Sequence, residues 1–149
     1  MAERYFEDFK PGDRVETSGL TLTESHMIAF ALSYDPQPFH IDREAAKSSI
    51  YGGLIGSGFL TMAVTFRLLL QSGMLGSANL GGIGFDEVRF LKPVRPGDTL
   101  CATVEVVDSR PSQSKADRGV LRLHYRTYNQ HGEEVMNFLC PHLIRRRPA

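Results

Sequence analysis

The sequence has no net charge, few cysteines and no apolar run long enough to cross a membrane. Its 17 basic and 17 acidic side chains cancel to a formal charge of +0. Nucleic acids and anionic membranes attract proteins through an excess of lysine and arginine, so this balance argues against both as main partners. The one basic cluster is Arg145, Arg146 and Arg147, and we expect it to be a solvated tail.

The shortage of cysteine and of long apolar runs excludes further classes of protein. Cys101 and Cys140 are too few and too far apart for a metal motif, so we expect no metal site. A small secreted domain normally carries more cysteines, which predicts reduced thiols and a cytoplasmic protein. The longest apolar run, around "GFLTMAVTFRLLL", is interrupted by Arg67 and is shorter than a bilayer span. The charged stretch "MAERYFEDFK" lacks the apolar segment of a signal peptide.

What the sequence does contain is the composition of an ordinary globular protein, 42% hydrophobic and 23% charged over 149 residues. This length predicts one domain over residues 1–149. Helical spacing comes first and strand patterns come last, which predicts an α+β fold. Stretches rich in β-branched and aromatic residues predict an antiparallel meander of four strands, and they cover residues 83–91, 98–110, 118–130 and 134–144.

The helical half is expected to supply the core. Residues 59–73 are apolar nearly all round, which predicts a buried helix of about four turns with Gly73 at its end. No other predicted element is hydrophobic enough to cover the sheet, so we expect the sheet to wrap around this helix. An earlier helix, capped by Thr21 or Thr23, must end by Asp35 because a proline follows.

The stretch "YDPQPFHID", residues 34–42, holds an acid and a base around a bend. Pro36 and Pro38 interrupt the helix, so the side chains of Asp35 and His40 can converge. A helix C-terminus should raise the pKa of Asp35, while a charged imidazole lowers it. Such a pair beside a pocket can hold a water and move protons at neutral pH. The alternative is a turn-forming aspartate and a half-buried histidine bonded to the backbone.

A glycine-rich stretch, "GGLIGSG", precedes the apolar helix. It leaves backbone N–H groups unblocked at a positive helix end, where they can bind a phosphate or polarise a carbonyl oxygen. The stretch lacks the lysine of a phosphate-binding loop and does not follow a strand, so a carbonyl is favoured over a nucleotide. Close helix packing at Gly56 and Gly58 is an equal alternative.

An acid–base pair and a carbonyl site together point to proton transfer beside a carbonyl group. The chain resembles the MaoC-like dehydratases, the (R)-specific enoyl-CoA hydratases of the hotdog fold, in which an antiparallel sheet wraps around a long central helix. The resemblance covers nearly the whole chain in the right order, through "YDPQPFHIDREAA", "GGLIGSGFLTMAV", "FLKPVRPGDTL" and "YRTYNQHGEEVMNFL". Its most specific part is the hydratase motif D-x-N-P-x-H, followed by an aspartate two positions on.

The resemblance implies catalytic roles for three residues. In the family, the aspartate and the histidine activate the water that adds across a trans-2-enoyl thioester, and in this chain they are Asp35 and His40. The glycine that offers its N–H to the thioester oxygen is Gly58. The asparagine of the motif is Gln37 here, and its extra methylene predicts a shifted substrate preference.

The resemblance also implies how substrate is bound. We expect contacts to an acyl-CoA thioester from Gln37, Pro38, Phe39, Ser57, Phe59, Lys92 and Arg95. The last two are candidate contacts for the coenzyme A phosphates, with ordinary solvated turn charges as the alternative. Residues 50–59 and 68–82 are expected to line the pocket of the acyl tail. No cofactor is expected beyond the coenzyme A of the substrate, and the implied assembly is a homodimer or a larger oligomer of dimers.

Two departures from the family bear on function. Ser57 stands where the family often has a histidine, and Ala63 where some members have a serine. Neither removes the acid–base pair, and both can reshape the acyl pocket. The predicted function is reversible hydration of a trans-2-enoyl-CoA to a (R)-3-hydroxyacyl-CoA. A hotdog thioesterase and a non-catalytic acyl-CoA binding protein remain alternatives, and the acyl group stays open.

Overall fold

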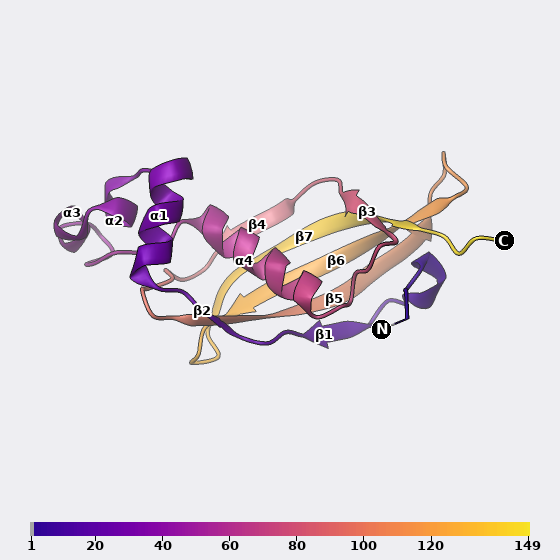
Figure 1. Ribbon diagram of the computed structural model, residues 1–149, viewed down its shortest axis with the longest axis horizontal. Helices are drawn as coiled ribbons and strands as arrows, with labels where there is room; N and C mark the ends of the chain where they lie inside the picture. The colour runs from indigo at the N-terminus through magenta and orange to yellow at the C-terminus, as the bar shows by residue number, and fades with distance from the viewer. Residues whose placement is uncertain (1) are drawn as a thin grey trace.

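The computed structural model describes residues 2–149, which form an antiparallel sheet packed against one long helix (Figure 1). The helical elements are the 3₁₀ helix η1 (Phe6–Asp8) and the α-helices α1 (Glu24–Tyr34), α2 (Pro38–Ile41), α3 (Arg43–Lys47) and α4 (Gly58–Gln71). The strands are β1 (Arg14–Glu16), β2 (Leu20–Thr21), β3 (Asn79–Gly82), β4 (Asp86–Phe90), β5 (Thr99–Pro111), β6 (Arg118–Tyr128) and β7 (Glu134–Arg145).

The sheet is built around three long neighbours, β5, β6 and β7, which form an antiparallel meander. The predicted meander had four strands, but its first strand, β4, pairs with β7 instead of β5. The strand order is β1-β5-β6-β7-β3, with β2 also paired to β5 and β4 also paired to β7. Buried positions alternate along β5 and β6, as expected for strands with one face on a core. Val104, Leu123 and Tyr125 are fully buried on that face.

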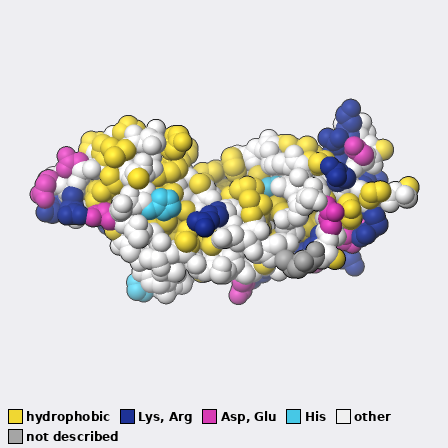
Figure 2. All heavy atoms as spheres, in the orientation of Figure 1, with side chains coloured by type: hydrophobic (Ala, Val, Ile, Leu, Met, Phe, Trp, Pro, Cys, Tyr) yellow, Lys and Arg dark blue, Asp and Glu magenta, His cyan; other side chains and the backbone are white. Residues whose placement is uncertain are grey.

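The central helix α4 covers the sheet, but it is not buried on all sides as predicted. Leu60, Val64 and Leu68 are buried against the strands. Phe59 and Phe66 remain 64% and 37% exposed on the opposite side. Figure 2 shows hydrophobic side chains over the middle of the molecule, where α4 crosses the sheet in Figure 1. Within residues 2–149, no helix is both long and apolar enough to cross a membrane.

Two parts of the sheet differ from the prediction. The strand β3 was not predicted, because "NLGG" has no β-branched or aromatic residue, and it pairs with β7 across an irregular register. The strand predicted at 83–91 is the shorter β4, since Glu87 adopts a φ of 52° and the register of β4 shifts between Asp86 and Arg89. Such bulges let an edge strand bend. Together β3 and β4 form one edge of the sheet.

The helices α1, α2 and α3 gather at one end of the sheet, opposite both chain termini (Figure 1). Thr23 caps α1 by accepting a hydrogen bond from the His26 N–H. Asp42 caps α3 by accepting from the N–H groups of Glu44 and Ala45. Pro36 follows the end of α1, and Asp42 ends α2 and caps α3, so these segments form an overhang of separate helices beside the start of α4.

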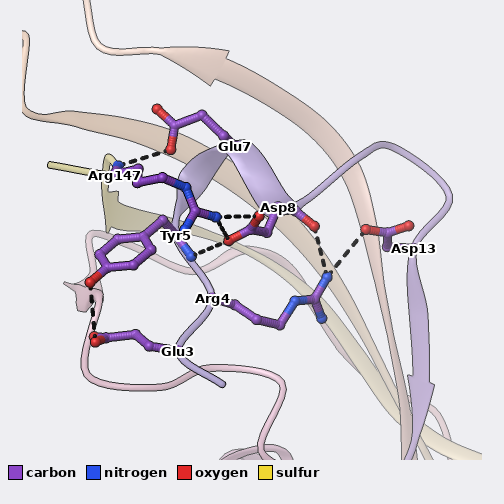
Figure 3. Close-up of polar contacts among 7 residues, drawn as sticks. All are labelled: Glu3, Arg4, Tyr5, Glu7, Asp8, Asp13 and Arg147. Carbon is purple, nitrogen blue, oxygen red and sulfur yellow. Dashed lines mark hydrogen bonds and ion pairs between the residues drawn. The ribbon is translucent and has the colours of Figure 1, made fainter. Parts of the chain in front are cut away.

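At the other end of the sheet, the C-terminal arginines bind the N-terminal segment instead of forming a solvated tail (Figure 3). Arg147 donates two hydrogen bonds of 2.7 Å to the carboxylate of Asp8. Its backbone N–H and the Arg146 side chain donate to the two oxygens of Glu7, each at 2.9 Å. The ring of Phe6 lies so close to Gly119 that a Cβ there would approach it to 2.3 Å.

The contacts of Glu7 with Arg146 and Arg147 predict a pH-dependent stability. Hydrogen bonds from Arg146 and from the Arg147 backbone lower the pKa of Glu7 from 4.5 to about 2. A carboxylate with a depressed pKa stabilises the folded state above its unfolded pKa, so this contribution is lost as the pH falls from about 4.5 to about 2. Glu7→Gln should therefore lower the Tm at pH 7 and flatten its decline in acid, while Glu16→Gln should not. Parallel Tm–pH curves for wild type and Glu7→Gln would contradict this.

Candidate active site

A cavity of about 490 Å³ lies where the helical overhang meets the start of α4 and the loop between β4 and β5. Most of its lining side chains are apolar. The residues that line it are Asp35, Gln37, Phe39, His40, Tyr51, Ile55, Gly56, Gly58, Phe59, Thr61, Phe90, Leu91, Lys92, Pro93, Val94 and Val135. A concave, largely apolar cavity with a few converging polar groups is the usual form of a small-molecule site.

Asp35 and His40 meet in this cavity. Helix α1 ends at Tyr34, and Asp35 leaves helical geometry because Pro36 follows. The chain then starts the short helix α2, which carries His40. The Asp35 Oδ2 and the His40 Nε2 are 3.2 Å apart, and their side chains are only 11% and 5% exposed. The bend therefore brings together the two residues that the sequence singled out.

The orientation of the His40 ring is set by the backbone. Its Nδ1 lies 2.8 Å from the carbonyl oxygen of Ile55. A carbonyl oxygen can only accept a hydrogen bond, so this contact assigns a proton to Nδ1. The Nε2 is consequently the atom that gains or loses a proton, and it faces the Asp35 carboxylate. This fixed ring gives the pair a defined route for proton transfer.

Asp35 is held as a carboxylate by three neighbours. Burial by itself would raise its pKa, but hydrogen bonds from Ser57 and Gln37 and the charge of His40 outweigh it, and the net pKa is lowered. The Ser57 Oγ donates to Oδ2 at 2.7 Å, and the Gln37 Nε2 donates to Oδ1 at 2.7 Å. Of the two opposing effects expected on this pKa, a helix C-terminus that raises it and an imidazole that lowers it, the net shift follows the second.

Gly58 is the first residue of α4 and lines the cavity beside the pair. The N–H groups in the first turn of a helix have no partner within the helix, and the Gly58 N–H has no hydrogen-bond acceptor elsewhere in residues 2–149, so it can bind a ligand. The ring of Phe90 lies directly against Gly58, and a Cβ at this position would come within 2.5 Å of it. A side chain at position 58 would therefore have to displace the Phe90 ring.

The remaining predicted binding residues divide into two groups. Gln37, Phe39, Phe59 and Lys92 line the cavity. Pro38, Ser57 and Arg95 do not. These seven residues were expected to contact substrate together. Of the last three, Ser57 is occupied with the Asp35 carboxylate, Arg95 donates to backbone carbonyls, and Pro38 is exposed.

The segments expected to line the tail pocket divide in the same way. The stretch 50–59 contributes lining residues, whereas no residue of 68–82 reaches the cavity. Ala63 is exposed on α4, away from the cavity. Thr61, Phe90 and Val135 line the cavity but were missed by the sequence reasoning, because each comes from a separate element and carries no local motif.

The two basic residues proposed for coenzyme A have other partners. Arg95 donates to the backbone carbonyls of Tyr51 and Gly53, at 2.5 and 3.2 Å, and so holds the glycine-rich loop. Lys92 forms an ion pair with Glu133 at the rim of the cavity, and its side chain is 51% exposed. Lys92 thus keeps half of its side chain exposed beside the cavity, whereas Arg95 is engaged with the protein.

The chemistry of the site follows from these contacts. A carboxylate and an imidazole share a cavity with a free N–H at a helix start, and this combination can move protons next to a polarised carbonyl. Within residues 2–149, no group of three or more His, Cys, Asp or Glu side chains is arranged to hold a metal ion. Fold and site together define a hotdog-type protein, with an antiparallel sheet around a central helix and an acid–base pair at the start of that helix.

Comparison with known proteins identifies the family to which the chain belongs. The family model of the MaoC like domain matches residues 8–125, and the chain belongs to this family of hydratases and dehydratases. The crystal structure of a MaoC-like dehydratase from Rhodospirillum rubrum is 38% identical, with a TM-score of 0.91 over 98% of this chain and 99% of that chain. The predicted hotdog fold and the predicted family are thereby confirmed.

Two curated relatives extend the comparison. The YdeM protein of Bacillus subtilis is 33% identical over 140 residues, which cover 94% of this chain and 98% of that protein. The (R)-specific enoyl-CoA hydratase of Rhodospirillum rubrum is 30% identical over 115 residues, which cover 73% of this chain and 74% of that enzyme. Similarity thus extends to a protein named for (R)-specific hydration.

Proposed function

We propose that this protein catalyses the reversible hydration of a trans-2-enoyl-CoA to a (R)-3-hydroxyacyl-CoA. The observation that carries the proposal is the 3.2 Å contact between Asp35 and His40 in a cavity beside the start of α4. Membership of the MaoC-like family and the similarity to a named (R)-specific enoyl-CoA hydratase support it. The reaction needs no cofactor beyond the coenzyme A of the substrate.

The acid–base pair activates the water. A water between the Asp35 carboxylate and the His40 Nε2 donates one hydrogen to each, which aims its oxygen lone pair at C3 of the enoyl group. As the oxygen bonds to C3, one proton passes from water to the pair. The π electrons of the double bond move toward the thioester oxygen and return to C2, which takes a proton from the pair. One water is consumed, and the pair returns to its starting state.

The start of α4 stabilises the negative charge that develops in this reaction. When water adds to C3, electron density accumulates on the thioester oxygen. The free N–H of Gly58 and the positive end of α4 meet this oxygen without reorganisation, because the helix already fixes them. The absence of a side chain at Gly58 keeps the approach open, since Phe90 occupies the neighbouring space.

The cavity suits an uncharged acyl group with a polar head. Phe39, Phe59 and Phe90 present aromatic surface to the acyl chain. Gln37 contacts the Asp35 carboxylate and so orients the site from its solvent side. Lys92 lies at the rim, where the coenzyme A phosphates would enter, and would exchange Glu133 for a phosphate.

Hydration is tested with purified protein and a series of trans-2-enoyl-CoA esters that begins with crotonyl-CoA. Loss of the conjugated thioester absorbance, with (R)-3-hydroxyacyl-CoA as product and no free thiol, is the expected result. Free thiol without hydration would identify a thioesterase and overturn the proposal. Binding of the saturated butyryl-CoA without turnover of any ester in the series would identify a non-catalytic binding protein.

We also propose that the protein forms a homodimer through the apolar surface on α4 and the β3–β4 edge. Exposed hydrophobic side chains on this surface include Phe59, Phe66, Leu80, Ile83 and Phe85. An exposed edge strand with hydrophobic side chains is prone to pair with another chain. A larger oligomer would be built from such dimers.

The proposed interface predicts that a charged side chain placed on it prevents dimerisation. Phe85 is 60% exposed at the β3–β4 edge, so Phe85→Glu should shift the protein from dimer to monomer in sedimentation velocity. Val107→Glu places the same charge on β5, away from this edge, and should leave the mass unchanged. A wild-type monomer, or a Phe85→Glu variant that still dimerises, would contradict the proposed interface.

A further inference from the structure

Ser57 is a buried residue that joins the acid–base pair to the central helix. Its side chain is fully buried, with 0% exposure, so it is out of reach of a bound substrate. Its Oγ lies 2.7 Å from the Asp35 Oδ2 and 3.2 Å from the Phe59 backbone nitrogen. One hydroxyl therefore touches both the carboxylate and the first turn of α4.

The direction of both hydrogen bonds follows from their chemistry. A backbone N–H can only donate, so the Ser57 oxygen accepts from Phe59 and caps the helix. The single hydroxyl hydrogen is then left for the Asp35 Oδ2, which accepts it. This oxygen is also the one that faces the His40 Nε2. The helix N–H polarises the hydroxyl, and hydrogen bonds in such a chain strengthen one another.

We propose that Ser57 is a positioning residue, which orients the Asp35 carboxylate toward His40 and fixes it relative to the Gly58 N–H. The inference rests on the proposed hydratase function and deepens it. Asp35 follows the last residue of α1 and has no helical geometry to hold it. Gln37, which donates to the other carboxylate oxygen, is exposed, so apart from His40 the buried partner of Asp35 is Ser57.

This arrangement explains how the chain departs from its family without losing the site. The family often has a histidine at the position of Ser57. Here a serine stands at that position and donates one hydrogen bond to the carboxylate. The same bond contributes to the lowered pKa of Asp35, after the opposing effect of burial. Loss of the hydroxyl should therefore raise the pKa of Asp35 and weaken its role as a base.

The test compares three substitutions that separate capping from positioning. Ser57→Ala removes both the cap and the donor, Ser57→Gly removes the donor but costs the cap only slightly, and Ser57→Thr keeps both. A hydrogen bond to a charged group predicts a loss of kcat/KM of roughly ten- to a hundred-fold in the Ala and Gly variants. In both, the acid limb of the kcat/KM–pH profile should move to higher pH. Ser57→Thr should keep the wild-type limb.

A purely structural role would give a different pattern. Activity would then follow the Tm across the variants, and the pH profile would not move. Thr23→Ala is the matched control, because it removes a helix cap that does not touch Asp35. Ala and Gly variants with the wild-type acid limb would overturn the proposal.

A second readout keeps the test independent of turnover. The side-chain carboxyl of Asp35 can be titrated by ¹³C NMR in protein labelled at aspartate, with Asp35→Asn to assign the signal. Its pKa should rise in Ser57→Ala and Ser57→Gly and stay low in Ser57→Thr. If the wild type hydrates no enoyl-CoA but this pattern holds, the proposed function fails and the positioning role stands. If the protein is an active hydratase but the pKa of Asp35 does not change in Ser57→Ala and Ser57→Gly, the positioning role fails and the proposed function stands.

Discussion

Asp35→Asn is expected to lower kcat/KM for enoyl-CoA hydration by about 10²- to 10⁴-fold, the usual contribution of a general acid–base residue. The amide cannot accept the proton that water must lose, and no other carboxylate lines the cavity within the described residues. The loss should appear in kcat as well as in kcat/KM, because the missing interaction belongs to the transition state. Stopped-flow measurement of conjugated-thioester absorbance gives both constants.

The fold should survive this substitution. The carbonyl of the introduced asparagine can still accept from Ser57, and the Gln37 amide can turn its oxygen toward the new amide nitrogen. The Tm is therefore expected to stay near that of the wild type. Asp108→Asn, which changes an exposed aspartate on β5, is the matched control. An Asp35→Asn protein with normal turnover would remove Asp35 from the catalytic step.

The sequence predicted the features of this site that depend on neighbouring residues. Pro36 predicted that α1 ends by Asp35, the residue directly before it. The bend that places Asp35 against His40 follows from this helix end. The glycine-rich stretch and the apolar run after it likewise predicted where α4 begins, because a helix start is a local property. The meander of β5, β6 and β7 follows from composition and turns.

Features that depend on distant segments were not predictable in the same way. Ser57 donates a hydrogen bond to Asp35, 22 positions earlier, and no local sequence pattern indicates that contact. Phe90 reaches Gly58 from the far edge of the sheet, and Arg147 finds Asp8 across 139 positions. Arg95 looked like a free cation in its turn, but the fold brings two backbone carbonyls to it. Charge and composition show what a side chain can bind, and only the fold shows which partner reaches it first.

His40→Gln is expected to reduce hydration by a similar factor, about 10²- to 10⁴-fold. The two ring nitrogens contact two acceptors, the Ile55 carbonyl at Nδ1 and the Asp35 carboxylate at Nε2. A glutamine amide donates from one end only, so one of these acceptors loses its partner, and the side chain cannot carry a proton at neutral pH. His131→Gln, at an exposed position, should leave the rate unchanged.

The double variant Asp35→Asn/His40→Gln decides whether the two residues act as one unit. If they share one water and one proton route, removal of either side chain already disables the step. The kcat/KM of the double variant should then be only slightly lower than that of the less active single variant, because the effects of catalytic groups that act together are strongly non-additive. Losses that multiply would mean that Asp35 and His40 act at separate steps. The shared-water mechanism would fail in that case, even with both residues essential.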